Sequence, residues 1–247
     1  MEPLYKQVFT VSDIHVDRFG RLKPSVVLYF AQEVAGTHAA LLGAGWETLA
    51  QKHLFWAVIR NRVQITRLPV RGETVTVETW PMPTTRSAYP RSVIAYDEQG
   101  NELFRSISLW VLMDSQTRAM VLPGKSGIRV PGSLRGTELA PPGSIAPAPL
   151  ANSTLRTVLY TELDRNGHMN NTRYLDWVAD LLPSAFHQQH PMREFTVCYL
   201  SEAKENQHLQ LFWELADGPC VRVDGCREKE NDPGKTERVF SIRAIFM

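Results

Sequence analysis

The pattern of apolar and polar residues gives the first half of the chain a strand followed by a long helix. Residues Leu4–Val16 set apolar side chains among polar neighbours, which favours a strand. Residues Ser25–Leu42 form a run that is apolar on nearly every side, interrupted mainly by Gln32, Glu33 and His38. A helix that is apolar all round is buried, so we expect this helix to lie inside a domain.

Four β-rich runs follow a short helical stretch at 46–53, and they complete the first half. Apolar and polar residues alternate strictly from Thr74 to Thr79, which is typical of a half-buried strand. The runs are 54–69, 73–82, 86–100 and 101–121. One long helix covered by a curved antiparallel sheet is an α+β arrangement, the one called a hotdog fold.

The second half repeats the same order of strand, helix and four strands. Residues 156–163 are predicted to form a strand and 169–182 a helix that stops before Pro183. The apolar positions of this helix share one face and are Tyr174, Leu175, Trp177, Val178, Leu181 and Leu182. The later strands are predicted at 194–203, 208–215, 220–230 and 236–247. The chain is therefore predicted to be a tandem, or double, hotdog.

A change of composition separates the two halves. Proline and glycine dominate residues 123–152, and no apolar period persists there. Such a stretch is typical of an extended linker. We therefore predict an N-terminal hotdog at 1–123, a linker at 124–152 and a C-terminal hotdog at 153–247.

Composition narrows the class of function. A formal net charge of +1 over 247 residues disfavours a nucleic-acid-binding protein, which would carry a large basic field. The 3 cysteines are an odd count without dense spacing, which favours a reducing compartment, and none sits in a CxxC or Cys/His metal pattern. We expect no metal site and no cofactor. The first residues lack the pattern of a secretory signal, and no apolar run reaches the ~18 residues of a membrane span. We expect a soluble, cytoplasmic protein without a membrane partner.

Candidate chemistry lies just before the second helix. Asp164, Asn166 and His168 are alternate residues, so extended backbone would place their side chains on one side. The helix start that follows carries unpaired N–H groups and partial positive charge. A histidine, an aspartate and an amide beside such a terminus suit acid–base catalysis at a carbonyl. The alternative is structural, because Asp and Asn before a helix are commonly cap and turn residues.

The longer string favours the catalytic interpretation. LDRNGHMNNTRYLDW, Leu163 to Trp177, resembles the acyl-ACP thioesterase pattern Leu-Asp-x-Asn-x-His-x-Asn-Asn-x-x-Tyr-x-x-Trp at every fixed position. Strings in the first half are also similar to that family. They lie at Pro69, Gly72, Glu73, Thr79 and Trp80, and from Trp110 to Arg118. The resemblance covers nearly the whole chain apart from the linker.

The resemblance implies the roles of particular residues. The family places an acidic residue on the strand after the second helix, and Glu202 matches it. Ala203 stands where plant members carry cysteine, which excludes a thiol nucleophile at that position. Glu202 and His168 would polarise a water molecule, or Asp164 would attack or orient. Asn166 would donate to the substrate carbonyl.

Further roles follow from the same comparison. Backbone N–H groups near Met169 and Asn170 would complete the oxyanion site, and Asn171 would be either a cap or an anchor. The catalytic residues Asp164, Asn166, His168 and Glu202 would lie in the C-terminal hotdog. The acyl chain would lie along the long helix of the N-terminal one.

The implied reaction is hydrolysis of fatty acyl-ACP to free fatty acid and carrier protein, which ends fatty acid chain elongation. The implied partner is an acyl carrier protein with its fatty acyl chain on phosphopantetheine, and a homodimer is left open. Two alternatives remain from the sequence. One is an acyl-CoA thioesterase of the same fold, and the other is a non-catalytic acyl-binding hotdog protein.

Overall fold

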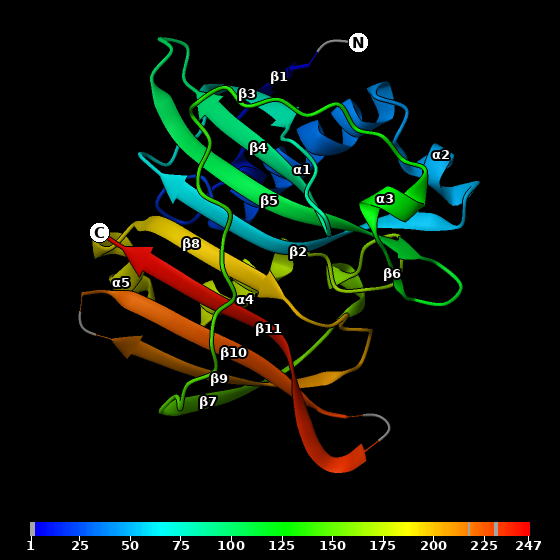
Figure 1. Cartoon of the computed structure of the whole chain (residues 1–247). Coiled ribbons are helices and arrows are strands. Elements are labelled where there is room, and N and C mark those ends of the chain that lie inside the picture. The colour runs from blue at the N-terminus through cyan, green and yellow to red at the C-terminus, as the bar shows by residue number, and fades with distance from the viewer. Residues whose placement is uncertain (1–2, 217, 230–231) are drawn as a thin grey trace. The chain divides into compact units, whose positions relative to one another are not determined.

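The chain folds into two compact units in a computed structural model that describes residues 3–216, 218–229 and 232–247. Unit 1 is Met1–Pro142 and unit 2 is Gly143–Met247. Each unit combines an antiparallel sheet with a few helices (Figure 1).

The sheet of unit 1 is fully antiparallel. Its strands are β1 (Tyr5–Thr10), β2 (Leu54–Ile65), β3 (Thr74–Pro81), β4 (Tyr89–Tyr96) and β5 (Glu102–Asp114), in the order β1-β3-β4-β5-β2. A short strand, β6 (Met120–Val121), pairs with β5. The alternation in the sequence is realised in β3, where Val75 and Val77 are fully buried and Thr76 between them is partly exposed.

Helix α1 (Pro24–Leu41) supplies the core of unit 1. Pro24 occupies the first turn, where its missing N–H costs nothing. The helix packs against β1 and β3, and Phe30 stacks on Phe9 of β1 with ring centroids 4.2 Å apart. Val27, Phe30 and Val34 are fully buried, but Tyr29 is 46% exposed and Leu41 is 62% exposed. The expectation that the helix is buried on nearly every side was therefore wrong, since one face of α1 is exposed. Two short helices, α2 (Trp46–Ala50) and α3 (Pro123–Ser126), complete the unit.

Unit 2 is built in the same order on a smaller scale. Its strands are β7 (Asn152–Thr157), β8 (Met192–Tyr199), β9 (His208–Ala216), β10 (Cys220–Lys229) and β11 (Asp232–Phe246), ordered β8-β11-β10-β9-β7. The helices are α4 (Arg173–Asp180) and α5 (Ser184–Gln189). Tyr174 of α4 packs edge-on against Phe240 of β11, with centroids 4.6 Å apart. Gly225 makes room for that ring, because a Cβ there would lie 2.0 Å from it.

The predicted repeat is confirmed, since strand, helix and four strands occur in each unit, and the chain is an α+β double hotdog. Several boundaries were wrong. The strand predicted at Leu4–Val16 ends at Thr10, and Asp13–His15 forms a 3-10 turn. The strand predicted at 156–163 ends at Thr157, and Tyr160–Glu162 forms a 3-10 turn. The helix predicted from Met169 begins only at Arg173. The Asn170 side chain accepts hydrogen bonds from the Thr172 N–H and hydroxyl, which holds the segment in a turn before the helix.

The proline-rich segment is anchored by side chains of the sheets. After α3 it contains no regular element until β7, and the division between the units falls inside it. In unit 1 the Trp80 indole donates to Glu138 at 3.0 Å, and in unit 2 the Arg238 guanidinium donates to the Ile145 carbonyl at 3.2 Å. The division into 1–123, 124–152 and 153–247 as functional regions stays a prediction.

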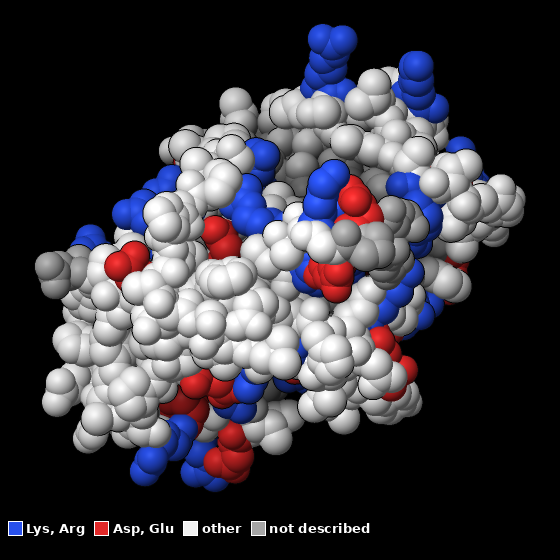
Figure 2. All heavy atoms as spheres, turned by 90° about the horizontal axis from the view of Figure 1, so that it is seen from below, with Lys and Arg blue, Asp and Glu red and all other residues white. Residues whose placement is uncertain are grey.

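The surface carries charges of both signs. On the face drawn in Figure 2, lysine and arginine side chains occur in small groups with acidic side chains nearby. This distribution agrees with the formal net charge of +1. Among the residues that the structure describes, no helix is long and apolar enough to cross a membrane.

Candidate active site

A tight turn, not an extended segment, carries the polar string before α4. The Asp164 N–H donates to the His168 carbonyl at 2.7 Å, and Leu163 forms a bridge with Met169. The Asp164 carboxylate accepts from the backbone N–H groups of Asn166 at 2.8 Å and His168 at 3.3 Å. Asp164 thus stabilises the turn through its side chain. The expectation that alternate residues share one side of extended backbone was wrong.

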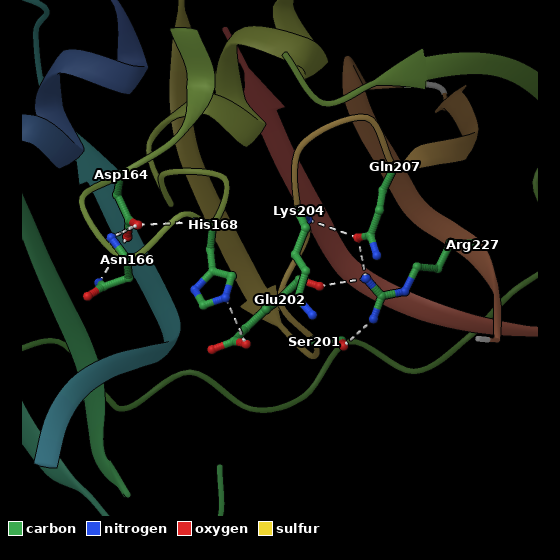
Figure 3. Close-up of polar contacts among 8 residues, drawn as sticks. All are labelled: Asp164, Asn166, His168, Ser201, Glu202, Lys204, Gln207 and Arg227. Atoms are coloured by element: carbon green, nitrogen blue, oxygen red, sulfur yellow. Dashed lines mark hydrogen bonds and ion pairs between the residues drawn. The ribbon is translucent and has the colours of Figure 1, made fainter. Parts of the chain in front are cut away.

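His168 nevertheless meets the predicted carboxylate. Its Nε2 lies 3.2 Å from Oε2 of Glu202. Figure 3 shows the His168 ring pointing toward that carboxylate. The His168 side chain is 17% exposed and that of Glu202 is 39% exposed, so the pair is partly desolvated but reachable by water. Two backbone contacts bring the segments together. Met169 donates its N–H to the Ala203 carbonyl at 2.8 Å, and His168 bridges Lys204.

Asp164 and Asn166 form a second contact within the same turn. The Asn166 side chain donates to the Asp164 carboxylate at 3.4 Å, a long hydrogen bond, and the residue is exposed. An amide nitrogen carries two N–H donors, so the Asn166 side chain retains capacity for another acceptor. The four predicted residues therefore occur as two contacts, Asp164 with Asn166 and His168 with Glu202, joined through the backbone of one turn.

The expected oxyanion site at Met169 and Asn170 is contradicted. The Met169 N–H is engaged by Ala203, and the Asn170 N–H donates to the Glu162 carbonyl at 2.8 Å. Neither belongs to the first turn of a helix, because α4 begins at Arg173. An N–H already bonded inside the protein cannot stabilise a substrate oxyanion without breaking that bond.

Asn171 is held by its backbone, since its carbonyl accepts a hydrogen bond of 2.9 Å from the Tyr199 hydroxyl. Its side-chain Oδ1 is buried, and within the described part of the chain it has no hydrogen-bond partner. The Thr172 backbone caps α4, so Asn171 is not the cap residue.

Aromatic residues support the site from the core. Tyr174 packs against Tyr199 with ring centroids 5.6 Å apart. Burial raises the pKa of the Tyr174 hydroxyl above its usual range, and Asp164 and Glu202 raise it further against an opposing effect of Arg227. Tyr174 therefore stays neutral and acts as packing for the site.

Cys198 and Cys226 are poorly suited to act as a catalytic thiol. Ala203 is fully buried, and Cys198, which would be the substitute for a cysteine at 203, is 1% exposed with its thiol toward the Gly143 carbonyl at 3.7 Å. Burial raises the pKa of the Cys226 thiol, with a further contribution from Asp224, which disfavours the reactive thiolate. Within the described residues, no cluster of histidine, cysteine and acidic side chains has the arrangement of a metal site.

Arg227, which the sequence pattern did not single out, contacts the loop that carries Glu202. Arg227 of β10 donates to the Glu202 carbonyl and to the Gln207 side chain, both at 2.6 Å, and to the Ser201 hydroxyl at 2.9 Å (Figure 3). The string CREKE around Arg227 has the composition of a solvent-exposed strand end, so no local signal pointed to this role. Only the register of β10 within the sheet brings Arg227 to the loop.

Comparisons with known proteins match this architecture. The family model of the acyl-ACP thioesterase N-terminal domain matches residues 2–122, and that of the C-terminal domain matches residues 150–239. Dodecanoyl-[acyl-carrier-protein] hydrolase of Cinnamomum camphora is 27% identical over 238 residues, and palmitoyl-acyl carrier protein thioesterase of Gossypium hirsutum is 25% identical over 237. Each alignment covers 87% of this chain, and the chain spans 60% and 55% of those relatives.

Solved structures agree on the fold. An acyl-ACP thioesterase from Bacteroides thetaiotaomicron gives a TM-score of 0.85 at 24% identity, covering 99% of this chain and 98% of that one. The 12:0-ACP thioesterase from Umbellularia californica gives 0.81 at 23% identity, with coverage of 100% and 98%. Both family models match in the expected order, and Glu202 and His168 meet inside the region of the second. The chain belongs to the acyl-ACP thioesterase family.

Proposed function

We propose that this chain hydrolyses the thioester of a fatty acyl group on acyl carrier protein and so ends chain elongation. The observation that carries the proposal is the 3.2 Å contact between His168 Nε2 and Glu202 Oε2 within the matched C-terminal domain. Relatives named as acyl-carrier-protein hydrolases and thioesterases support the substrate class.

The proposed chemistry needs a base, a donor and a leaving group. Glu202 is the more exposed member of the pair and binds the attacking water, while His168 fixes the orientation of the carboxylate. Glu202 takes a proton from water, and the water oxygen attacks the thioester carbonyl carbon. The remaining side-chain N–H of Asn166 donates to the carbonyl oxygen as it becomes negative. The C–S bond then breaks, and the thiolate sulfur of the phosphopantetheine arm takes the proton held by Glu202, which gives the free thiol and the fatty acid.

Asp164 has a structural role in this proposal. Its carboxylate already accepts two backbone N–H groups and the Asn166 amide, so it orders the turn that presents Asn166 and His168. A carboxylate with those bonds made is poorly placed to attack a carbonyl. We place the reaction in the cytoplasm, where the free cysteines of the chain stay reduced.

The test is release of free fatty acid from a ladder of acyl-carrier-protein substrates, with the matched acyl-CoA esters as controls. We expect turnover of the carrier-bound substrates with a higher kcat/KM than for the CoA esters. Equal or better turnover of acyl-CoA would instead identify an acyl-CoA thioesterase. Tight binding of acyl chains without release would identify a binding protein.

A further inference from the structure

The guanidinium of Arg227 is surrounded by polar atoms of the loop that carries Glu202. Nη1 donates to the Glu202 carbonyl and to Gln207 Oε1, and Nη2 donates to the Ser201 hydroxyl. The remaining Nε donates to Glu237 of β11 at 2.8 Å. The Arg227 side chain is only 12% exposed, so these contacts are largely shielded from water.

The same contacts close the loop on itself. Gln207 Oε1 accepts from both Arg227 and the Lys204 N–H, the latter at 2.9 Å. One guanidinium therefore ties both ends of residues 201–207 to β10. A planar fork of donors is suited to this because its geometry is fixed, whereas an ammonium group would be a single mobile charge.

Glu202 lies between two anchors. Arg227 donates a hydrogen bond to the backbone carbonyl of Glu202. The Met169 N–H donates to the carbonyl of Ala203, the next residue. Met169 directly follows His168, so the second anchor fixes the distance between the two backbones. The Glu202 side chain leaves the backbone between these anchors and reaches His168 Nε2.

We propose that Arg227 is the positioning residue of the His168–Glu202 pair. It contacts no reacting atom and acts by fixing the backbone from which the carboxylate extends. The Glu237 carboxylate pairs with the charge of Arg227, and the loop carbonyl and side chains accept its other N–H groups. The buried arginine is therefore both paired and hydrogen-bonded. The kinetic part of this inference rests on the proposed hydrolysis, while the geometric part does not.

The test compares Arg227→Met with Arg222→Met in the full chain. Arg222 lies on the same strand and donates to the Ala146 carbonyl, away from the Glu202 loop, which makes it the matched control. In crystal structures we expect Arg227→Met to separate Glu202 from His168 beyond about 3.5 Å, the limit of a hydrogen bond. We expect Arg222→Met to keep the contact.

Kinetics separate positioning from a loss of stability. We expect Arg227→Met to lower kcat on the order of 10²-fold with KM changed by no more than about threefold, because misplacement of a catalytic group affects the transition state more than binding. In a Glu202→Gln background the same change should have little further effect on kcat, since the residue it positions is already disabled. Arg227→Lys keeps the charge and should give an intermediate kcat, which covers the case that the methionine variant fails to fold.

Two results would overturn the inference. The first is that the contact between Glu202 and His168 persists in Arg227→Met and that this variant has the same kcat as Arg222→Met. The other is an equal drop in kcat with and without Glu202→Gln, which indicates a general structural role. If the unmodified chain releases no fatty acid, the proposed function fails, and the crystal structures alone decide whether Arg227 positions the pair.

Discussion

The same tight turn occurs once in each unit, and only one of the two carries a candidate catalytic pair. In unit 1 the Asp17 N–H donates to the Arg21 carbonyl at 2.7 Å, and in unit 2 the Asp164 N–H donates to the His168 carbonyl at the same distance. In both turns the aspartate Oδ1 also accepts from the N–H groups two and four residues later. The turn is therefore a structural unit of the fold, independent of catalysis.

The residue that closes the turn makes the difference. In unit 1 the Arg21 guanidinium returns to the Asp17 carboxylate at 3.2 Å and lies over the Phe19 ring, 5.1 Å from its centroid. The positive charge of Arg21 is therefore paired with Asp17 inside the turn. In unit 2 His168 leaves the turn and reaches Glu202.

The facing loops differ at the matching position. In each unit the residue after the turn donates its N–H to a loop carbonyl, at 2.7 Å in unit 1 and 2.8 Å in unit 2. The donor and acceptor pairs are Leu22 with Pro69 and Met169 with Ala203. The residue before the acceptor is Leu68 in unit 1, which is 8% exposed, and Glu202 in unit 2. The two units thus differ at two equivalent positions. Arg21 and Leu68 of unit 1 correspond to His168 and Glu202 of the candidate active site in unit 2.

The largest effect should come from changing the pair itself. We expect His168→Ala and Glu202→Gln each to lower kcat for acyl-carrier-protein hydrolysis by about 10²–10⁴-fold, because each removes a member of the acid–base machinery. The double variant should be little worse than either single one, since the two residues act as a unit. Steady-state fatty acid release measures all three variants.

The control lies in the other turn. Arg21→Ala removes the equivalent side chain of unit 1, and we expect kcat to stay within about twofold because its partly buried ion pair with Asp17 lies in the turn that carries no candidate catalytic pair. A loss of kcat in Arg21→Ala as large as in His168→Ala would contradict the comparison and make both turns catalytic.

The apolar periodicity of the sequence was sufficient to predict the architecture. It could not predict the geometry of the site, because a side chain there forms hydrogen bonds with the backbone. The position of helix α1 and the alternating burial of strand β3 follow from their apolar patterns, although one face of α1 is exposed. The string at 164–168 pointed to residues that lie together in one turn, but the extended backbone expected there was wrong. The reason is that the Asp164 carboxylate captures backbone N–H groups, an interaction that a two-residue period does not encode. Arg227 reaches its loop only through strand register, which no local string specifies.

An intermediate effect should separate the structure of the turn from its chemistry. Asp164→Ala removes the acceptor for two N–H groups, so we expect the free energy of unfolding to fall by about 2 kcal/mol. Asp164→Asn keeps an acceptor oxygen and loses the charge, so it should retain the turn and kcat within about fivefold. Urea unfolding and fatty acid release measure the two quantities. Abolished hydrolysis in a stably folded Asp164→Asn would show that the carboxylate itself acts on the substrate.

Asp17→Ala and Asp17→Asn are the matched pair in unit 1. We expect them to change the free energy of unfolding by amounts similar to those at Asp164, because the backbone hydrogen bonds are the same. We expect no loss of kcat beyond about twofold, since a weakened surface turn in unit 1 leaves the His168–Glu202 contact in place. A kcat that follows stability equally at both aspartates would mean that the two turns contribute to catalysis alike.

The smallest effect concerns the glycines that the two turns share. Gly20 and Gly167 both have φ of +76°, and a Cβ would meet no atom within 4 Å at either position. Alanine therefore strains only the backbone, and we expect Gly20→Ala and Gly167→Ala each to lower the free energy of unfolding by about 1 kcal/mol, with asparagine at either position costing less. Gly167 precedes His168, so relaxation of the strain there should turn the imidazole away from Glu202 and lower kcat several-fold, while Gly20→Ala leaves kcat unchanged. If Gly20→Ala and Gly167→Ala lower the free energy of unfolding equally but only Gly167→Ala lowers kcat, the two turns have the same structural role. The side chains that they carry then decide which turn takes part in catalysis.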